Sequence, residues 1–419
     1  MSREMRHSGI EWIGEIPKEW KVSSVRWIMA NKSIRNQPNS EVLSLYRDWG
    51  IVPKSSRDDN HNVTSEDTSN YKVVQKGDFV INKMKAWQGS MAVSEYDGII
   101  SPAYYVCSFI DENICKRYIH HLLRNESYKT EYMRLSSGLR VGQWDLNIEN
   151  FLRIPIVLPP LSEQQKIANY LDKVCGEVDE MIALQEQMIE ELKAYEQSVI
   201  IEAVTKSLNP DVPMKHSGID WIGEVPEGWK VIKIKHLLNE RKERSIAGLE
   251  EPLSMSQKFG LIPTKEMDSI PNIASSFVGA KLVYQHDLVF NKLKAHLGVF
   301  AESDYDGLVS PDYAVYYSSG LVEVKYLEYL FKSPQYIGEF IKLSTGVGAG
   351  LTRLYTSDLY SIDGIVPPIE IQKEIVDYIR QLSSEIDALI AIKQAKIDEL
   401  KNYKKSVIYE YVTGKKEVV

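Results

Sequence analysis

The sequence contains few cysteines and no long hydrophobic run. Its three cysteines, Cys107, Cys115 and Cys175, lack the close pairwise spacing of zinc sites and redox motifs. This argues against a structural zinc site or a disulfide framework and is usual for a protein of a reducing cytoplasm. No run of about 18 apolar residues occurs, and the first residues lack the apolar core of a signal peptide. We therefore expect a cytoplasmic protein with no membrane-spanning segment.

Familiar catalytic motifs are also missing. The sequence has no G-x-x-x-x-G-K-[ST] phosphate loop and no H-E-x-x-H zinc motif, and its eight histidines show no ligand spacing. The glycine-rich segment 346–350 lacks the third glycine of a dinucleotide-binding turn, so we interpret it as a flexible turn. Asp97 and Asp306 lie in repeated Tyr-Asp-Gly segments, where a turn between strands is favoured over a catalytic carboxylate. The sequence therefore predicts no catalytic, cofactor-binding or metal-binding residue.

The chain lacks an excess of basic residues. It has 50 Lys+Arg against 58 Asp+Glu, a net charge of −8. Much of this deficit lies in residues 161–206, which contain 4 basic and 10 acidic side chains. The overall electrostatic field of such a protein would not attract a nucleic acid, so DNA binding would require local clusters of basic side chains.

What the sequence does contain is an internal duplication. Residues 7–22 (HSGIEWIGEIPKEWKV) and 216–231 (HSGIDWIGEVPEGWKV) are nearly identical. Further matched segments follow in the same order in both halves: Asn-Lys-[Met/Leu]-Lys-Ala, then Asp-Gly-[Ile/Leu]-[Ile/Val]-Ser-Pro, then a double proline. Internal repeats of this kind should decide the fold prediction, and here they predict two copies of one domain.

Each copy combines strands with helices. Short apolar runs separated by Gly, Pro, Asn and Asp about every 8–12 residues are typical of strands. A helical stretch follows near residues 113–135 and 321–343, so we expect a mixed α+β domain of about 150 residues in each half. Four tryptophans in the best-matched segment are expected to pack it onto the domain or the long helices, with a pocket lining as the alternative. These are Trp12, Trp20, Trp221 and Trp229.

Two long helices are predicted after the double prolines. Apolar residues recur at alternating steps of three and four over several heptads, which is typical of a coiled coil. In the first helix the predicted contact residues are Ile167, Leu171, Val174, Val178, Met181 and Leu192. In the second helix they are Ile375, Ile379, Leu382, Ile386, Leu389 and Leu400.

The apolar residues of the two predicted helices form series of matched length, so the two helices can bury these residues against each other. Gln185 and Lys393 interrupt them at equivalent positions, either to set the register or because the contact is locally hydrated. The predicted organisation is a first domain at 1–160, a helix at 161–206, a second domain at 207–368 and a helix at 369–419. The fold class is α+β, with the two domains separated by a pair of long helices.

Paired lysines are the best candidates for DNA contact. Lys83 and Lys85 recur as Lys292 and Lys294 directly after an apolar strand, and on a continuing strand each pair would point to one face. A solvated edge strand protected by lysines is the alternative. Trp87 and His296 follow on the same predicted face. Further candidates are Lys54, Arg57, Arg140, Gln143, Lys258 and Arg353, with Trp144 beside them, because Arg and Gln can contact base edges and Lys can contact phosphate.

Taken together, these motifs resemble the specificity subunits of type I restriction–modification enzymes. The residues concerned are W-I-G-x-[IV]-P-x-x-W, N-K-[ML]-K-A and D-G-[IL]-[IV]-S-P in each half, and the helix start P-P-L-S-E-Q-Q-K-I. The resemblance covers essentially the whole chain. In the second half the helix start is Pro-Ile-Glu-Ile-Gln, which keeps Gln372 but replaces the Ser-Glu of the first.

The resemblance implies a non-catalytic subunit with two target recognition domains. Each domain would bind one half of a split, asymmetric DNA sequence, and the helices would form an antiparallel coiled coil that docks two methyltransferase (modification) subunits. Restriction/translocase subunits would join through the complex. No cofactor would be bound by this chain: S-adenosylmethionine belongs to the methyltransferase partner, and ATP and Mg to the restriction partner. The alternatives are an enzyme with unrecognised catalytic residues and an assembly scaffold that does not contact DNA.

Overall fold

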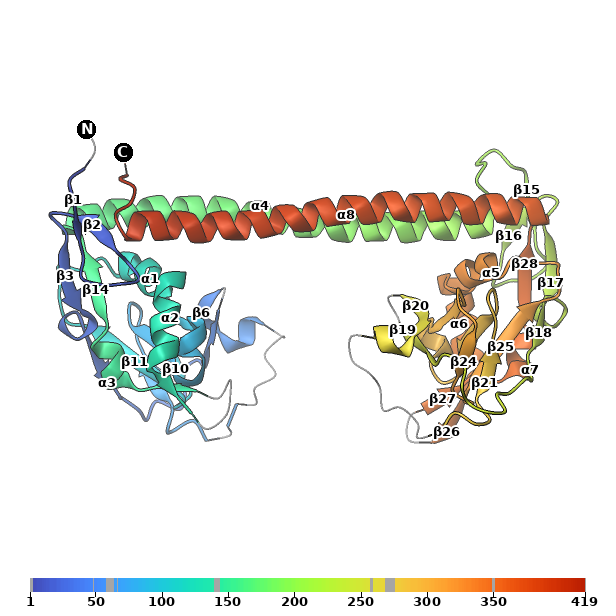
Figure 1. Ribbon diagram of the computed structural model, residues 1–419, viewed down its shortest axis with the longest axis horizontal. Coiled ribbons are helices and arrows are strands. Elements are labelled where there is room, and N and C mark those ends of the chain that lie inside the picture. Colours follow the sequence, from blue (N-terminus) through green and yellow to red (C-terminus); the bar gives the residue numbers. More distant parts are fainter. Residues whose placement is uncertain are drawn as a thin grey trace. The chain divides into compact units, whose positions relative to one another are not determined.

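The computed structural model describes residues 3–47, 49–57, 64–65, 67–138, 144–256, 259–267, 276–348 and 351–418. The chain divides into two compact units, one comprising Met1–Glu186 with Lys393–Val419 and the other Gln187–Ile392. Each unit contains one copy of the repeat. Each also contains part of both long helices, α4 (Leu161–Lys206) and α8 (Ile369–Val412) (Figure 1).

The globular part of the first unit is a mixed α+β fold. Its strands are β1 (Met5–His7), β2 (Glu15–Pro17), β3 (Lys21–Ser24), β4 (Met29–Lys32), β5 (Leu43–Tyr46), β6 (Gly50–Pro53), β7 (Lys72–Val74), β8 (Phe79–Asn82), β9 (Met91–Val93), β10 (Gly98–Ile100), β11 (Tyr104–Phe109), β12 (Ser136–Ser137), β13 (Asp145–Leu146) and β14 (Pro155–Leu158). Its helices are η1 (Val25–Trp27), η2 (Lys54–Ser56), η3 (Lys83–Gln88), α1 (Lys116–Arg124), α2 (Glu126–Leu135) and α3 (Ile148–Leu152).

The second unit repeats this order of elements. Its strands are β15 (Met214–His216), β16 (Glu224–Pro226), β17 (Lys230–Lys233), β18 (Leu238–Glu240), β19 (Leu253–Ser256), β20 (Gly260–Pro263), β21 (Lys281–Val283), β22 (Leu288–Asn291), β23 (Phe300–Glu302), β24 (Gly307–Val309), β25 (Tyr313–Ser318), β26 (Thr345–Gly348), β27 (Leu351–Arg353) and β28 (Asp363–Val366). Its helices are η4 (Ile234–His236), η5 (Thr264–Glu266), η6 (Ala295–Leu297), α5 (Val324–Phe331), α6 (Pro334–Leu343) and α7 (Thr356–Ser361).

An antiparallel four-stranded sheet lies at the centre of each globular part. Its strand order is β4-β11-β8-β9 in the first unit and β18-β25-β22-β23 in the second. Tyr104 faces Asn82 across one sheet, and Tyr313 faces Asn291 at the same register in the other. One face of each sheet packs against the helices, and the other packs against a hairpin, β5–β6 or β19–β20. The duplication predicted from sequence is therefore a duplication of the fold.

The predicted helical stretches each form two helices. The N-terminal stretch divides at Asn125, whose side chain caps α2 by accepting the Ser127 N–H at 2.8 Å. The C-terminal stretch divides at Ser333, which is followed by a proline at the start of α6. Both breaks are caused by residues that favour helix starts over helix interiors.

A buried glutamine fixes the start of each long helix to its globular part. The Gln164 side chain accepts the Cys115 N–H at 2.9 Å and donates to the Pro159 carbonyl at 2.9 Å. Gln372 makes the same contacts, with the Glu323 N–H at 2.8 Å and the Pro367 carbonyl at 2.8 Å. This explains why Gln372 is kept where the rest of the helix start differs.

A buried tyrosine fixes the end of the other helix in each unit. The Tyr118 hydroxyl lies 3.0 Å from the Val157 carbonyl and 3.1 Å from the carbonyl of Val412, at the end of α8. The Tyr326 hydroxyl lies 3.0 Å from the carbonyl of Val204, near the end of α4. The last carbonyls of a helix have no partner within it, so these hydroxyls satisfy them. Each globular part therefore contacts the start of one long helix and the end of the other.

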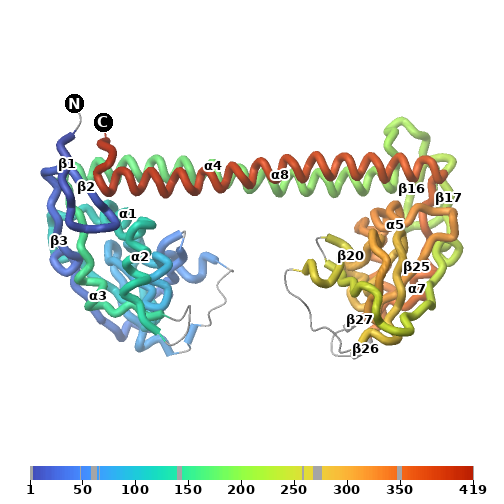
Figure 2. Tube along the Cα trace, viewed as in Figure 1, coloured from blue at the N-terminus to red at the C-terminus, as the bar shows by residue number. Residues whose placement is uncertain are grey.

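The two helices run side by side in opposite directions, as predicted (Figure 2). In the first unit the rings of Tyr170 and Tyr411 pack at a tilt of 40° with centroids 4.5 Å apart, and Lys404 pairs with Asp179 at 2.6 Å. Because the residue number rises on α4 while it falls on α8, the pairing is antiparallel. In the second unit Ala203 and Val204 join the same hydrophobic core as Ile375, Val376 and Ile379.

Part of the predicted contact series is displaced by one residue. Two of the predicted contact residues are largely exposed: Met181 is 44% and Leu389 is 46% exposed. The others are buried or half-buried. The buried residues are Ile167, Leu171, Val178, Ile375, Ile379, Ile386 and Leu400, and the half-buried residues are Val174, Leu192 and Leu382. The neighbouring Ile182 and Ile390 are half-buried instead. Both choices have the same heptad spacing, so periodicity could not distinguish them, and our assignment of Met181 and Leu389 was wrong. The apolar side chains left exposed are available to other contacts.

The tryptophans of the repeated segment are structural. Trp20 is buried and donates from Nε1 to Glu163 in the first turn of α4 at 3.1 Å. Trp12 meets Tyr128 edge-on with ring centroids 6.1 Å apart, and Trp221 meets Tyr336 in the same way at 5.0 Å. These rings therefore pack the repeated segment against the domain and the helix, as expected, and Trp221 also lines a cavity, which was the alternative.

Candidate nucleic-acid interface

The paired lysines lie in a tight turn and do not continue a strand. The Asn82 side chain ends β8 by accepting the N–H groups of Met84 and Lys85, at 3.1 and 3.2 Å, and the 3₁₀ helix η3 follows. Asn291 accepts the Leu293 N–H at 3.1 Å in the second unit. The expectation that Lys83, Lys85 and Trp87 share one strand face was wrong, as was the same expectation for Lys292, Lys294 and His296. An asparagine cap competes with the strand at this point.

Lys83 belongs to a cationic cluster around Tyr105. Its Nζ lies 4.6 Å from the Tyr105 ring centre, and the Nζ of buried Lys72 lies 5.3 Å from the same ring. Lys72 donates to the Tyr104 carbonyl at 2.6 Å. Burial, followed by the charges of Lys83 and Arg35, lowers the pKa of Lys72. An anion bound here would relieve the repulsion among the three cations.

The second unit contains the corresponding cluster with two acidic residues added. Lys281 and Lys292 occupy the places of Lys72 and Lys83, and burial followed by Lys281 lowers the pKa of Lys292. Lys281 pairs with Glu240 at 3.4 Å. Arg353 pairs with Asp312 at 3.3 Å. The first unit has Asn31 and Ala103 where the second has these two carboxylates, so the two clusters differ in charge.

The structure brings together candidates that are far apart in the sequence. Trp87 packs edge-on against Trp144, with ring centroids 5.4 Å apart, and so joins η3 to the segment that precedes β13. In the second unit the Leu354 N–H donates to the Lys292 carbonyl at 3.0 Å, which places Arg353 beside Lys292. Each lysine turn is therefore adjacent to a described residue that comes after the Ser/Thr-Gly motif, Trp144 in the first unit and Arg353 in the second. Lys85 and Lys294 are exposed at this surface, and Lys83, Lys292 and His296 are half-buried.

The remaining candidates are elsewhere or are not described. Lys54 donates to the Thr64 hydroxyl at 2.5 Å. The Arg57 guanidinium lies 5.2 Å from both the Tyr46 and the Trp49 ring centres, next to the β5–β6 hairpin. Arg140, Gln143 and Lys258 lie outside the described residues.

Sequence reasoning missed the buried lysine of each cluster. Lys72 and Lys281 begin β7 and β21, where a lysine would ordinarily be taken for a strand-end residue exposed to solvent. The available signal was their recurrence at equivalent positions of the two repeats.

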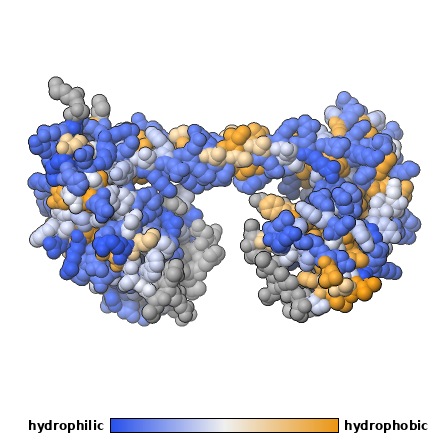
Figure 3. All heavy atoms as spheres, in the orientation of Figure 1, coloured by the Kyte–Doolittle hydropathy of each residue, from blue (hydrophilic) through white to orange (hydrophobic). Residues whose placement is uncertain are grey.

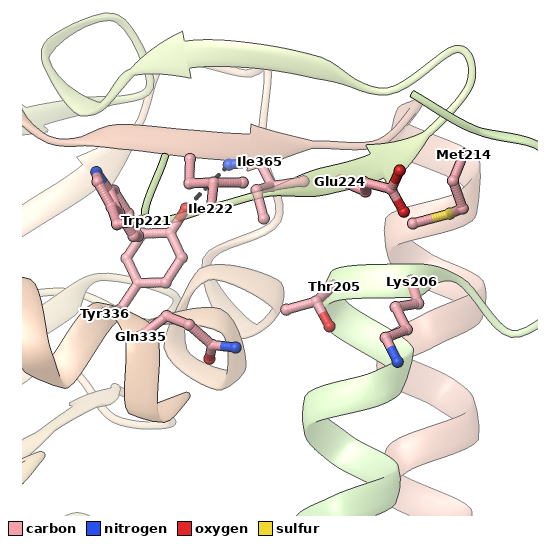
Figure 4. A pocket seen from close by; sticks show the side chains of 9 residues that line it. All are labelled: Thr205, Lys206, Met214, Trp221, Ile222, Glu224, Gln335, Tyr336 and Ile365. Carbon is pink, nitrogen blue, oxygen red and sulfur yellow. Dashed lines mark hydrogen bonds between the residues drawn. The ribbon is translucent and has the colours of Figure 1, made fainter. Parts of the chain in front are cut away.

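A cavity of about 240 Å³ lies in the second unit (Figure 4). Trp221, Tyr336 and Gln335 line one side, and Lys206, Met214 and Glu224 lie across from them. The Tyr336 hydroxyl donates to the Asp363 carbonyl at 2.9 Å and accepts the Ile365 N–H at 3.1 Å, and burial raises its pKa. This hydroxyl is committed to holding α6 against β28, so we assign the cavity no chemical role.

The carboxylates and glycines considered as alternative sites have structural positions. Asp97 accepts the Lys76 N–H at 2.9 Å and Asp306 accepts the Gln285 N–H at 2.8 Å, so both tie neighbouring turns together. Gly346 lies in β26, so the interpretation of 346–350 as only a turn was wrong there. Among the described residues no three His, Cys, Asp or Glu side chains are grouped as metal ligands. In the same part of the chain, no helix has the length and hydrophobicity needed to cross a bilayer.

Comparison with known proteins gives a consistent result. A family model for the type I restriction modification DNA specificity domain matches residues 17–194. The putative type I restriction enzyme MjaX specificity subunit of Methanocaldococcus jannaschii is 24% identical over 96% of this chain and 95% of its own length.

Two solved structures share the fold. A chain from a study of complex assembly and conformational transition of the type I R-M system has a TM-score of 0.69 at 16% identity, covering 95% of this chain and 98% of its own. The HsdS subunit from Thermoanaerobacter tengcongensis has a TM-score of 0.52 at 16% identity, with the same coverage. Alongside the duplicated fold and the paired long helices, these matches show that the chain is similar over nearly its whole length to type I restriction–modification specificity subunits.

Proposed function

We propose that this chain is the DNA sequence-specificity subunit of a type I restriction–modification complex. Each globular part binds one half of a bipartite, asymmetric target in double-stranded DNA. The chain itself catalyses nothing, and it acts in the cytoplasm where host DNA is accessible. The observation that carries this proposal is the pair of cationic clusters, around Lys72 and Lys83 in one unit and around Lys281 and Lys292 in the other.

The clusters suit DNA for an electrostatic reason. The protein has a net charge of −8, so only local groups of cations can hold phosphates. Lysines repeated at one structural position give each unit the same means of contacting the backbone, whereas the bases must be distinguished by residues that differ. The added Glu240 and Asp312 are differences of this kind, and they support two half-targets of unlike sequence.

The long helices are proposed to hold the partner subunits. Met181 and Leu184 are exposed on α4, and Leu389 and Ile392 are exposed at the corresponding positions of α8. Residues three apart lie on one face of a helix, so each helix presents an apolar strip to solvent. Figure 3 displays hydrophobic residues on the surface of these helices. Strips of this kind are typical of protein contacts, and their duplication supports two copies of one partner.

The partners would bring the chemistry. We assign these strips to two methyltransferase (modification) subunits, which would bind S-adenosylmethionine. Restriction/translocase subunits would bind ATP and Mg and would join through the complex. The specificity subunit contributes the position of the complex on DNA and no reacting group.

Replacing two lysines tests the DNA contact. Lys83→Ala with Lys85→Ala is expected to weaken DNA binding and to reduce the slope of log affinity against log salt by about 2, because each lost phosphate contact removes about 0.9. Filter binding from about 50 to 200 mM salt measures this slope. The control is Lys173→Ala with Lys193→Ala, which removes two exposed charges from α4. Equal slopes for both double variants would assign Lys83 and Lys85 a structural role.

A further inference from the structure

The β5–β6 and β19–β20 hairpins carry an exposed aromatic side chain at the same position of their tips. Trp49 is 68% exposed and Phe259 is 59% exposed. Each precedes a glycine in the left-handed region, Gly50 at φ 73° and Gly260 at φ 70°. The strands around them have the same register, with Tyr46 opposite Gly50 and Ser256 opposite Gly260. Trp49 and Phe259 therefore occupy the same position relative to the strands that follow them.

The hairpins below these tips are firmly held. The Glu41 carbonyl accepts the Ile99 N–H at 2.8 Å, and the Glu251 carbonyl accepts the Leu308 N–H at 2.9 Å. Leu43 and Leu253 are buried in the hydrophobic cluster between the hairpin and the central sheet of their unit. The base of each hairpin is therefore fixed by the core of its unit.

The repetition makes these aromatic residues informative. A single exposed aromatic residue is ordinary on a protein surface. Between the strands, however, the first repeat has Arg47-Asp48-Trp49 and the second has Gln257-Lys258-Phe259, so only the aromatic character is kept. Trp27 provides the contrast, because it is 64% exposed but the second repeat has His236 in its place.

The surroundings of Trp49 favour a nucleic acid as the ligand. The Arg57 guanidinium lies 5.2 Å from the Trp49 ring and 5.2 Å from the Tyr46 ring. A cation stacked on aromatic rings beside an exposed ring offers one group for a phosphate and another for a base face. Stacking on a base is tolerant of sequence because every base has a π-face, so the same residue type can serve two different half-targets.

We propose that Trp49 and Phe259 insert as aromatic wedges against the bases of duplex DNA, one in each half of the target. The inference rests on the proposed function and adds to it the residues that contact bases by stacking. Insertion of an apolar side chain partly unstacks a base step, and this cost is recovered by the new contact. The wedges fix the depth of each hairpin in its groove, while neighbouring residues distinguish the bases.

The test uses the full-length chain, a 40-base-pair duplex selected by that chain from a random pool, and the same duplex with one unpaired base at each successive position. Trp49→Ala and Phe259→Ala are each expected to weaken binding about 10-fold with an unchanged salt slope. Trp49→Phe should keep most of the affinity. An unpaired base at the contacted step should strengthen binding of the wild type but not of Trp49→Ala. Trp27→Ala, which removes an exposed tryptophan beside Arg26 at 5.2 Å, is the matched control.

The outcomes separate this inference from the proposed function. If the wild type selects and binds a duplex but Trp49→Ala and Phe259→Ala bind like Trp27→Ala, the wedges are refuted and the function stands. A reduced salt slope in Trp49→Ala together with an unchanged response to the unpaired base would also refute them, because the ring would then act only by holding Arg57. If the wild type binds no duplex, the proposed function fails and the wedges fail with it. Unchanged thermal unfolding of each variant shows that folding is not the cause.

Discussion

Removing one heptad from each long helix is expected to shorten the gap between the two methylated half-sites while leaving the bases of both halves unchanged. Seven residues removed from the centre of both α4 and α8 preserve the coiled-coil register, because the contact pattern repeats every seven residues. They shorten each helix by about 10 Å at about 1.5 Å per residue. This corresponds to about three base pairs of DNA.

The measurement is sequencing of methylated DNA from cells that express the variant with its methyltransferase partner. A control variant in which the same seven residues are replaced by another heptad keeps the length and should keep the original gap. An unchanged gap in the shortened variant would show that the helices do not set the spacing. Removing three residues from each helix should abolish methylation instead, since it rotates the contact residues out of register.

Replacement of Glu328 is expected to cause a large loss of stability. This carboxylate is buried in α5 and accepts the Glu302 N–H at 2.9 Å. It also pairs with Lys325 at 2.9 Å and with Lys332 at 2.6 Å. Glu328→Ala should lower the free energy of unfolding by about 3 kcal/mol, because it leaves a buried N–H and two lysines without their partner. Glu399→Gln, which breaks an exposed pair on α8, should cost at most about 1 kcal/mol.

The effect of Glu328 should depend on pH. Burial raises the pKa of Glu328, but Lys332 and Lys325 outweigh burial and hold it below its usual value. A carboxylate with a lowered pKa in the folded state stabilises the protein above its unfolded pKa of about 4.3, and this contribution is lost as the pH falls through the folded pKa. The unfolding midpoints of Glu328→Gln and the wild type in urea should therefore differ at pH 7 and converge as the pH falls below the lowered pKa of Glu328. A difference independent of pH would assign the effect to packing.

The duplication explains why the general fold could be predicted from the sequence. Repeated segments and heptads are long-range regularities, so two domains and two paired helices followed from the pattern alone. The duplication also extends to residues that differ between the two copies. His120 in the first copy occupies the position of Glu328 in the second and makes the equivalent hydrogen bond. His120 accepts the Val93 N–H at 3.2 Å, just as Glu328 accepts that of Glu302. Burial, then Arg124, lowers the pKa of His120, so an uncharged ring replaces the charged carboxylate.

Local competition explains what could not be predicted. Asn82 ends its strand because its side chain captures two backbone N–H groups, and an Asn-Lys sequence does not reveal whether the strand or the cap prevails. Met181 and Ile182 are both apolar, and only the partner helix decides between them. The cluster around Tyr105 brings Lys72 of β7 close to Lys83, although β7 pairs with β10 and not with β8 or β11. Such contacts depend on register, which the sequence specifies only through the whole sheet.

The central claim is that one chain with two DNA-binding units determines a two-part target. Its most direct test is single-molecule sequencing of methylated DNA from cells that carry the methyltransferase partner with and without this chain. We predict methylation that depends on the chain, at one asymmetric sequence made of two short specified halves separated by a gap of unspecified bases. Exchanging residues 207–368 for those of a relative should change one half and leave the other. A single uninterrupted target, or methylation that is the same without the chain, would contradict the account.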